Sequence, residues 1–317
     1  PTMARILFRT VSTTDRPIGG VKAIFQAAAI LADAGVDARV ATAAGMPKWL
    51  SDDPIASRAV ILNTGDVVEI GRSDVVVLHE SLDERELEAA LRLRCPVVLY
   101  CQNHVYLSRN QPLVDVLRER WPIASVSEVA RSAIARMIGR DNIRVIPPNV
   151  DQDTFRPTGR KRPRSIALMP RKHRNRISET RTAIEDACGP EPIDWIEIDD
   201  VSAIEAASRL AEAEVFLSLG RDEGFSLPPV EAMAAGCLVA GFESGGMADY
   251  TNADNGLWCA EGAFSALPAL ACAALDLAGN EEASARMRAA GRATAARFQP
   301  DHVLPAWRDW LDHELER

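Results

Sequence analysis

Two patterns of hydrophobic and polar positions alternate along the chain. Short apolar runs rich in β-branched residues predict strands, and segments with apolar residues three or four positions apart predict helices. The predicted strands cover residues 5–8, 37–42, 74–79, 96–101, 123–127, 143–147, 165–169, 194–198, 214–219 and 237–242. The predicted helices between them include residues 20–35, 82–94, 127–139, 178–189, 202–213 and 228–236. Continuous apolar strands that are each followed by a helix are typical of parallel sheets covered on both faces.

This alternation breaks once, over residues 146–163, where four prolines and several charges predict an interdomain linker. We therefore expect two doubly wound α/β domains that face a cleft, with ligands beyond the carboxyl ends of the strands. The expected parts are a domain at 1–150, a linker at 151–163, a domain at 164–300 and a helix at 301–317. That last helix has an apolar stripe, which predicts packing on the protein body and a path back to the N-terminal domain. The stripe consists of Val303, Leu304, Trp307, Trp310, Leu311 and Leu315.

Composition narrows the class of protein. The 317 residues carry a net charge of −9, which argues against nucleic acid as the main partner. No apolar run reaches the roughly 20 residues that span a bilayer, and the first ten residues lack the pattern of a secretory signal. The six cysteines form no C-x-x-C pair, so buried free thiols are favoured over a disulfide framework or a zinc site. These observations predict a cytoplasmic protein.

Positive charge is concentrated in one region of this acidic chain. Residues 156–181 hold ten Lys or Arg and one acidic residue, which indicates a localised anionic ligand. We interpret residues 159–164 alone as part of a solvated linker. The cations that follow the predicted strand 165–169 lie at its carboxyl end, where phosphate binding is favoured over a solvated loop. They are Arg171, Lys172, Arg174 and Arg176.

The predicted N-terminal domain offers weaker candidates. Gly19 and Gly20 open a helix after a polar loop, so either close approach of a phosphate or a flexible turn accounts for them. A G-x-G-x-x-G fingerprint directly after the strand is absent, which disfavours a dehydrogenase. His79 and His104 each follow a strand, and we take His104 as a catalytic candidate and His79 as structural or pocket-lining. No histidine pair has H-x-x-x-H spacing, and we expect no protein-held metal.

Residues 221–237, RDEGFSLPPVEAMAAGC, join a buried strand to a helix through a sharp turn. Ser226 is a candidate N-cap, and prolines are tolerated in the first helical turn that follows it. Backbone N–H groups of residues 224–227 are then expected to face an anion. Glu223 and Glu231 flank the turn and can accept hydrogen bonds from hydroxyl groups. Phosphate donors between two hydroxyl acceptors predict a nucleotide diphosphate sugar as ligand.

The stretch EGFSLPPVEAMAAG resembles the E-x7-E signature of retaining glycosyltransferases with the GT-B fold, most closely glycosyltransferase family 4. The linker IPPNVDQDTFRP, the later segments GGMADY and NGLW, and the Gly19–Gly20 pair are also similar to that family. The resemblance covers most of the chain. It implies a retaining hexosyltransferase (EC 2.4 class) that moves a sugar from a UDP- or GDP-linked donor to an acceptor hydroxyl. No metal and no other cofactor are implied.

The resemblance also implies a role for each matching residue. Glu223 is expected to bind hydroxyls of the donor sugar and to steady positive charge at the anomeric carbon, and Glu231 to bind the ribose. The backbone from Phe225 to Leu227, through Ser226 and after Gly224, is expected to hold the diphosphate. Arg171 and a second cation assist it. The family's second cation falls at Arg176, with Lys172 as the competitor, and Pro170 replaces the usual glycine before Arg171. His104 aligns with the acceptor-side histidine.

The sequence does not define the acceptor substrate. A glycan, a lipid-linked sugar or a small molecule are all compatible, as is peripheral membrane contact without a transmembrane segment. Two alternatives share the architecture. One is a GT-B nucleotide-sugar epimerase or hydrolase, which requires carboxylates for acid/base chemistry. The other is a non-catalytic module that binds a nucleotide sugar or a partner protein.

Overall fold

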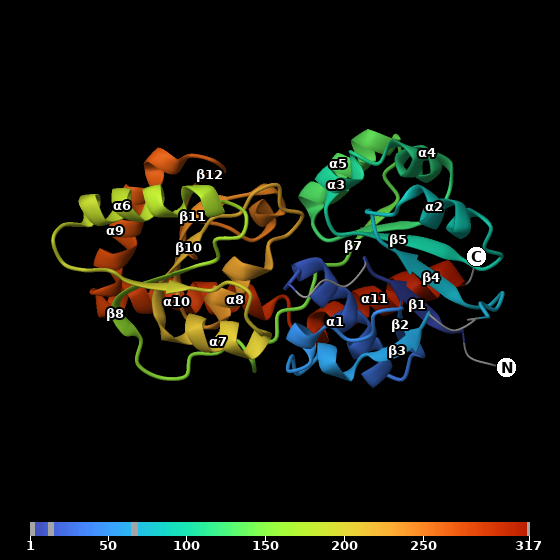
Figure 1. Cartoon of the computed structure of the whole chain (residues 1–317), viewed down its shortest axis with the longest axis horizontal. Coiled ribbons are helices and arrows are strands. Elements are labelled where there is room, and N and C mark those ends of the chain that lie inside the picture. Colours follow the sequence, from blue (N-terminus) through green and yellow to red (C-terminus); the bar gives the residue numbers. More distant parts are fainter. Residues whose placement is uncertain (1–3, 12–15, 65–68, 316–317) are drawn as a thin grey trace. The chain divides into compact units, whose positions relative to one another are not determined.

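The computed structural model describes residues 4–11, 16–64 and 69–315 (Figure 1). The chain forms two compact units. Unit 1 comprises Pro1–Asn149 together with Pro300–Arg317, and unit 2 comprises Val150–Gln299. The C-terminal helix therefore belongs to the same unit as the N-terminal half of the chain.

Unit 1 is built on a parallel sheet of seven strands in the order β3-β2-β1-β4-β5-β6-β7. The strands are β1 Ile6–Arg9, β2 Ala38–Thr42, β3 Val60–Asn63, β4 Val75–Leu78, β5 Val97–Cys101, β6 Ile123–Ser125 and β7 Ile143–Val145. The helices are α1 Gly19–Asp33, α2 Glu84–Leu91, α3 His104–Leu107, α4 Gln111–Glu119, α5 Glu128–Ile138 and α11 Pro300–Leu315, with short 3-10 turns η1 Lys48–Leu50 and η2 Ala56–Arg58. Strands β4 and β5 are buried throughout, as expected for parallel strands covered on both faces.

Helix α11 contributes to the core of unit 1. The Trp307 ring packs edge-on against Phe8 of β1 at 5.4 Å and Tyr100 of β5 at 4.7 Å between ring centroids. Helices α1 and α11 lie side by side (Figure 1). The predicted apolar stripe is confirmed at its buried members, which are Val303, Trp307, Trp310 and Leu311.

Unit 2 has a parallel sheet of five strands in the order β12-β11-β10-β8-β9. The strands are β8 Arg162–Leu168, β9 Asp194–Glu197, β10 Ala213–Ser218, β11 Leu238–Glu243 and β12 Leu257–Ala260. The helices are α6 Ile177–Cys188, α7 Ala203–Glu212, α8 Leu227–Ala234, α9 Leu267–Ala278 and α10 Glu281–Ala296, with 3-10 turns η3 Arg174–Arg176, η4 Gly245–Asp249 and η5 Phe264–Ala266. Two doubly wound parallel sheets confirm the predicted α/β class.

The interpretation of residues 159–164 as a solvated linker is wrong at Lys161. Its Nζ donates hydrogen bonds to the carbonyl oxygens of Ala211 at 3.1 Å and Ala235 at 3.0 Å. These carbonyls lie at the C-terminal ends of α7 and α8, where unpaired carbonyl groups and the helix dipole favour a cation. Strand β8 already begins at Arg162, inside the segment predicted to be linker.

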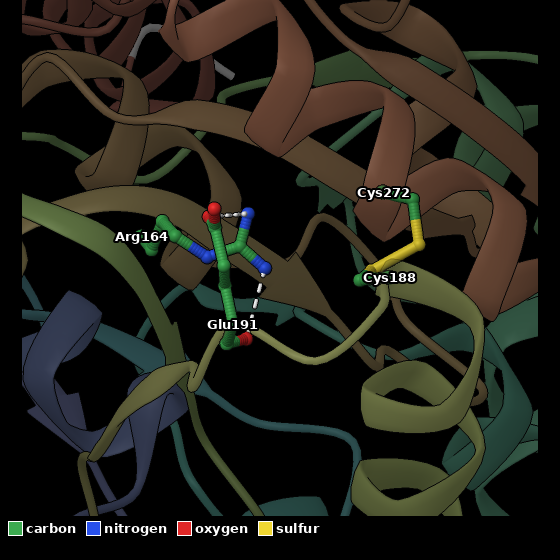
Figure 2. Close-up of a disulfide and its surroundings, with 4 residues drawn as sticks. All are labelled: Arg164, Cys188, Glu191 and Cys272. Atoms are coloured by element: carbon green, nitrogen blue, oxygen red, sulfur yellow. Dashed lines mark hydrogen bonds and ion pairs between the residues drawn. A yellow bond between two sulfur atoms is a disulfide. The ribbon is translucent and has the colours of Figure 1, made fainter.

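The expectation of free thiols throughout is also wrong for one pair. Cys188, the last residue of α6, forms a disulfide with Cys272 of α9, 84 positions later in the chain (Figure 2). The other four cysteines are free. Beside the bridge, the Arg164 guanidinium donates to the Glu191 carbonyl at 3.1 Å and pairs with its carboxylate (Figure 2). The packing of α6 on α9 brings the two sulfurs together, and sequence spacing does not reveal such a tertiary contact.

Reduction of this disulfide should destabilise unit 2. A bridge that closes a loop of this length restricts the unfolded chain and contributes about 2–4 kcal/mol. We expect the Cys188→Ser/Cys272→Ser variant to melt on the order of 5–10 °C below the wild type. Calorimetry with and without dithiothreitol measures this, with Cys259→Ser as the control. An unchanged melting temperature after reduction would contradict the predicted contribution.

Candidate functional site

The two motifs singled out in the C-terminal half follow neighbouring strands. Strand β8 pairs with β10, with Leu168 opposite Leu217, so their carboxyl ends lie at the same edge of the sheet. The chain continues from β8 to β9 on one side and from β10 to β11 on the other. This reversal is the topological switch point at which doubly wound sheets bind ligands. The loops 169–176 and 219–226 both start there.

The side chain of Phe225 anchors the turn that precedes α8. Its ring is 5% exposed and packs on Phe298 at 4.9 Å and Tyr250 at 5.3 Å between centroids. The Tyr250 hydroxyl donates to the Ser226 carbonyl at 2.9 Å. The turn is therefore fixed from the core side by an aromatic cluster and a buried hydrogen bond.

The expectation that Ser226 caps the helix is correct in position and wrong in mechanism. Ser226 occupies the N-cap position of α8, but its side chain makes no capping hydrogen bond. Its φ of 69° lies in the left-handed region, whereas a capping serine normally has an extended backbone. Pro228 and Pro229 supply no N–H groups to the first turn of the helix.

Glu223 lies at the centre of the loop after β10. Its Oε1 atom is 2.7 Å from Lys172 Nζ, and both side chains are less than one-fifth exposed. The same Nζ donates to the Arg221 carbonyl at 2.5 Å. The structure thus brings together a predicted cation and a predicted carboxylate from adjacent strand ends. A partly buried charge requires such a partner.

The Gly-Gly segment after β11 holds the backbone of Glu223. The Gly246 N–H donates to the Glu223 carbonyl at 3.0 Å. Gly245 has a φ of 51°, and a Cβ there would lie 2.0 Å from the Glu223 carbonyl oxygen. Only glycine fits at position 245 between these two loops, which explains the first residue of the Gly-Gly pair.

A third carboxylate, Glu261, was not identified from the sequence. It follows β12 and accepts the Asp222 N–H at 3.2 Å, together with the hydroxyl of the buried Ser244. Asp222 has a φ of 53°, so this N–H turns toward Glu261 in a conformation that is uncommon for aspartate. No sequence motif marks Glu261, because only the tertiary structure places it beside the turn.

Glu231 lies on α8, a helix that is buried along most of its length. Glu231 is 6% exposed, whereas the side chain of Glu223 is 18% exposed. Glu231 is therefore more deeply buried than Glu223.

The four cations predicted to bind phosphate differ in their contacts. Arg171 is exposed, and the described residues offer it no hydrogen bond or ion pair. Arg174 pairs with Asp199 at 2.6 Å. Arg176 stacks over the Phe264 ring at 4.0 Å and donates to Glu179 at 3.0 Å. Of the two candidates for second cation, Lys172 lies beside Glu223 and Arg176 is engaged elsewhere.

In unit 1, the predicted residues follow β1, β4 and β5. Gly19 and Gly20 open α1, and a Cβ on Gly20 would lie 3.0 Å from Gln102 Oε1. His104 is the first residue of α3. His79 is 4% exposed, and its Nδ1 accepts the Ser81 N–H at 3.2 Å. Burial lowers the pKa of His79 to about 4, so it is neutral at physiological pH and fits a structural role.

No helix among the described residues combines the length and apolar character needed to span a bilayer.

Comparison with known proteins adds three findings. Residues 198–294 match the family model described as Glycosyl transferases group 1. An alpha-1,6-glucosyltransferase of Actinobacillus pleuropneumoniae serotype 7 is 29% identical over 133 residues, covering 39% of this chain and 40% of that protein. The chain therefore matches less than half the length of this curated relative.

Solved structures resemble the chain along nearly its whole length. HepE of Anabaena, in complex with UDP and glucose, has a TM-score of 0.72 and 15% identity over 98% of this chain and all of that one. Sucrose-phosphate synthase of Thermosynechococcus elongatus has the same TM-score and 14% identity, with 98% of each chain covered. The chain thus has the GT-B fold, and its segment 198–294, which contains Glu223 and Glu231, matches the group 1 glycosyl transferases.

Proposed function

We propose that the protein is a metal-independent glycosyltransferase that moves a hexose from a nucleotide diphosphate sugar to an acceptor hydroxyl with retention of configuration. The bond between the anomeric carbon and the diphosphate oxygen breaks. A bond from that carbon to the acceptor oxygen forms on the same face of the sugar. The acceptor proton passes to the departing diphosphate, so charge and atoms balance without another reactant.

The pairing of Lys172 with Glu223 at the switch point of unit 2 carries this proposal. A sugar diphosphate presents hydroxyl groups next to a dianionic group. It therefore needs a hydrogen-bond acceptor and a cation side by side. Glu223 supplies the hydrogen-bond acceptor and Lys172 supplies the cation. Both lie next to the turn that opens α8. Positive groups fixed where the leaving group develops charge are the main means of catalysing such a transfer.

Each residue at the junction then has a role. Glu223 binds hydroxyls of the donor sugar, and Glu231 binds the ribose. The diphosphate lies against the backbone of residues 224–227, with Arg171 and Lys172 around it. Arg176 supports the loop through Phe264 rather than contacting the phosphates. No other cofactor is required.

In this proposal unit 1 binds the acceptor substrate. We assign His104, at the start of α3, to the acceptor hydroxyl. Gly19 and Gly20, by contrast, belong to donor binding and allow close approach of a phosphate to the start of α1. The acceptor is a glycan, a lipid-linked sugar or a small molecule. Peripheral contact with a membrane is compatible with lipid-linked acceptors.

The relatives support this reading. HepE has been solved with UDP-glucose as well as with UDP and glucose, and the curated relative is named an alpha-1,6-glucosyltransferase. We therefore propose a UDP- or GDP-linked hexose as donor and place UDP-glucose first among the donors to test.

Loss of the Glu223 carboxylate should abolish transfer without unfolding the protein. We expect Glu223→Gln to lower kcat by about 100-fold or more, because a transition-state contact is lost. The assay follows release of UDP or GDP from a panel of their sugars, and melting curves check the fold. Glu205→Gln is the control, since it removes an exposed carboxylate on α7.

Wild-type activity of the Glu223→Gln variant would refute the catalytic role. Donor binding by the wild type without turnover would instead indicate a non-catalytic module. No binding of any nucleotide diphosphate or its sugar would refute the whole proposal.

The cation assignment gives a separate test in calorimetry. Lys172→Met and Arg171→Ala should each weaken binding of the nucleoside diphosphate by about 10-fold or more, because a charge-assisted hydrogen bond is lost. Nucleoside binding should change much less. Arg176→Gln serves as the matched control on the same loop and should leave the diphosphate affinity within about twofold of the wild type. A larger loss in Arg176→Gln than in Lys172→Met would reverse the assignment.

A further inference from the structure

A buried carboxylate in unit 1 lies against the turn that leads into α3. Glu80 is the second residue after β4 and is only 6% exposed. Its Oε2 accepts the backbone N–H of Gln102 at 3.0 Å, and the carboxylate also accepts the N–H of Asn103. The side chain of Glu80 therefore binds two consecutive N–H groups at the end of the neighbouring strand β5.

A second connection joins the same two loops. The Asn110 side chain donates from Nδ2 to the carbonyls of Glu80 at 3.3 Å and Leu82 at 2.9 Å. The loop after β4 is thus bonded to both ends of the segment 102–110. Between these anchors, Asn103 caps α3 by accepting the Val105 N–H at 2.9 Å. His104 lies between the cap and the rest of α3, so its backbone position depends on the Glu80 contacts.

We propose that Glu80 is a positioning residue for the acceptor reaction, which acts through the Gln102–Asn103 turn to hold His104 in place. This inference rests on the proposed glycosyl transfer. The Gln102 side chain, which faces Gly20 at the start of α1, is held by the same turn. The Glu80 carboxylate therefore fixes the backbone from which the side chains of Gln102 and His104 project.

The environment of Glu80 makes its charge depend on pH near neutrality. Burial raises the pKa of Glu80 to about 7, although the backbone N–H groups oppose this shift. Burial raises the pKa values of Tyr100 and Cys101 on β5, and the charge of Glu80 adds to both shifts. His79, which precedes Glu80 in the chain, is neutral. Among the described residues, no cation forms an ion pair with Glu80. The nearby Arg9 on β1 pairs with Glu86.

Within the closed turn, ionisation of Glu80 should strengthen its hydrogen bonds to the backbone. A carboxylate accepts both N–H groups on free lone pairs, whereas protonation places a hydrogen on one oxygen and weakens the contact. We therefore expect transfer to increase as the pH rises through about 7. Folding stability responds in the opposite direction. Because the folded pKa is above the unfolded value, the contribution of Glu80 is present at low pH and is lost as the pH rises through the folded pKa.

The kinetic test compares wild type, Glu80→Gln and the control Glu88→Gln from pH 5.5 to 8.5. Glu88 is an exposed carboxylate on α2 of the same unit. The wild-type and control rates of transfer should rise by up to about tenfold per pH unit below 7 and level off above it. Glu80→Gln should be at least tenfold slower at pH 8 and lack this step, with an unchanged Kd for UDP. A wild-type rate and pH profile in Glu80→Gln would overturn the inference.

Hydrogen exchange supplies a readout that needs no activity. In the wild-type protein, amides of residues 102–107 should become less protected as the pH rises through 7, after correction for intrinsic exchange, because opening the turn hydrates Glu80 and favours its ionised form. Unchanged protection there would overturn the inference even if Glu80→Gln does not fold. Absence of turnover with every nucleotide sugar, combined with the expected exchange pattern, would refute the proposed function and leave the link between Glu80 and the turn intact.

Discussion

The ion pair between Lys172 and Glu223 is the contact on which the candidate site of unit 2 depends. Each charge is partly withdrawn from water, and the attraction of the other offsets part of that cost. The same ammonium group holds the Arg221 carbonyl, so it fixes the backbone just before Glu223 as well as its side chain. A diphosphate near this loop would meet a lysine whose position is already set, and release of Glu223 toward the sugar would accompany its binding.

Everything around this pair restricts the loop to one conformation. The aromatic cluster under Phe225 fixes it from the core, Gly246 holds the Glu223 carbonyl, and Glu261 accepts the Asp222 N–H. At the other end of α8, Lys161 binds the terminal carbonyl groups, so both ends of this helix are set by specific contacts. A rigid turn at the carboxyl end of a parallel sheet lowers the cost of ordering a ligand.

Much of this arrangement could be predicted from the sequence, because periodicity and turn chemistry are local. Ten of the strands and the 221–237 junction follow directly from them. The edge strands β3 and β12 were missed because their apolar pattern is short and weak. Lys161, Glu80, Glu261 and the Cys188–Cys272 bridge act through partners tens of residues away. Ser226 was misjudged because its type suits a cap while its positive φ does not.

The most direct measurement is a crystal structure of the protein with a bound nucleoside diphosphate such as UDP. We expect the diphosphate oxygens within hydrogen-bond distance of Lys172 Nζ and the backbone N–H groups of residues 225–227. The ribose hydroxyls should lie against Glu231. A nucleotide bound away from the carboxyl ends of β8 and β10, or held by Arg174 and Arg176 with Lys172 still paired only to Glu223, would contradict the proposed role of the junction.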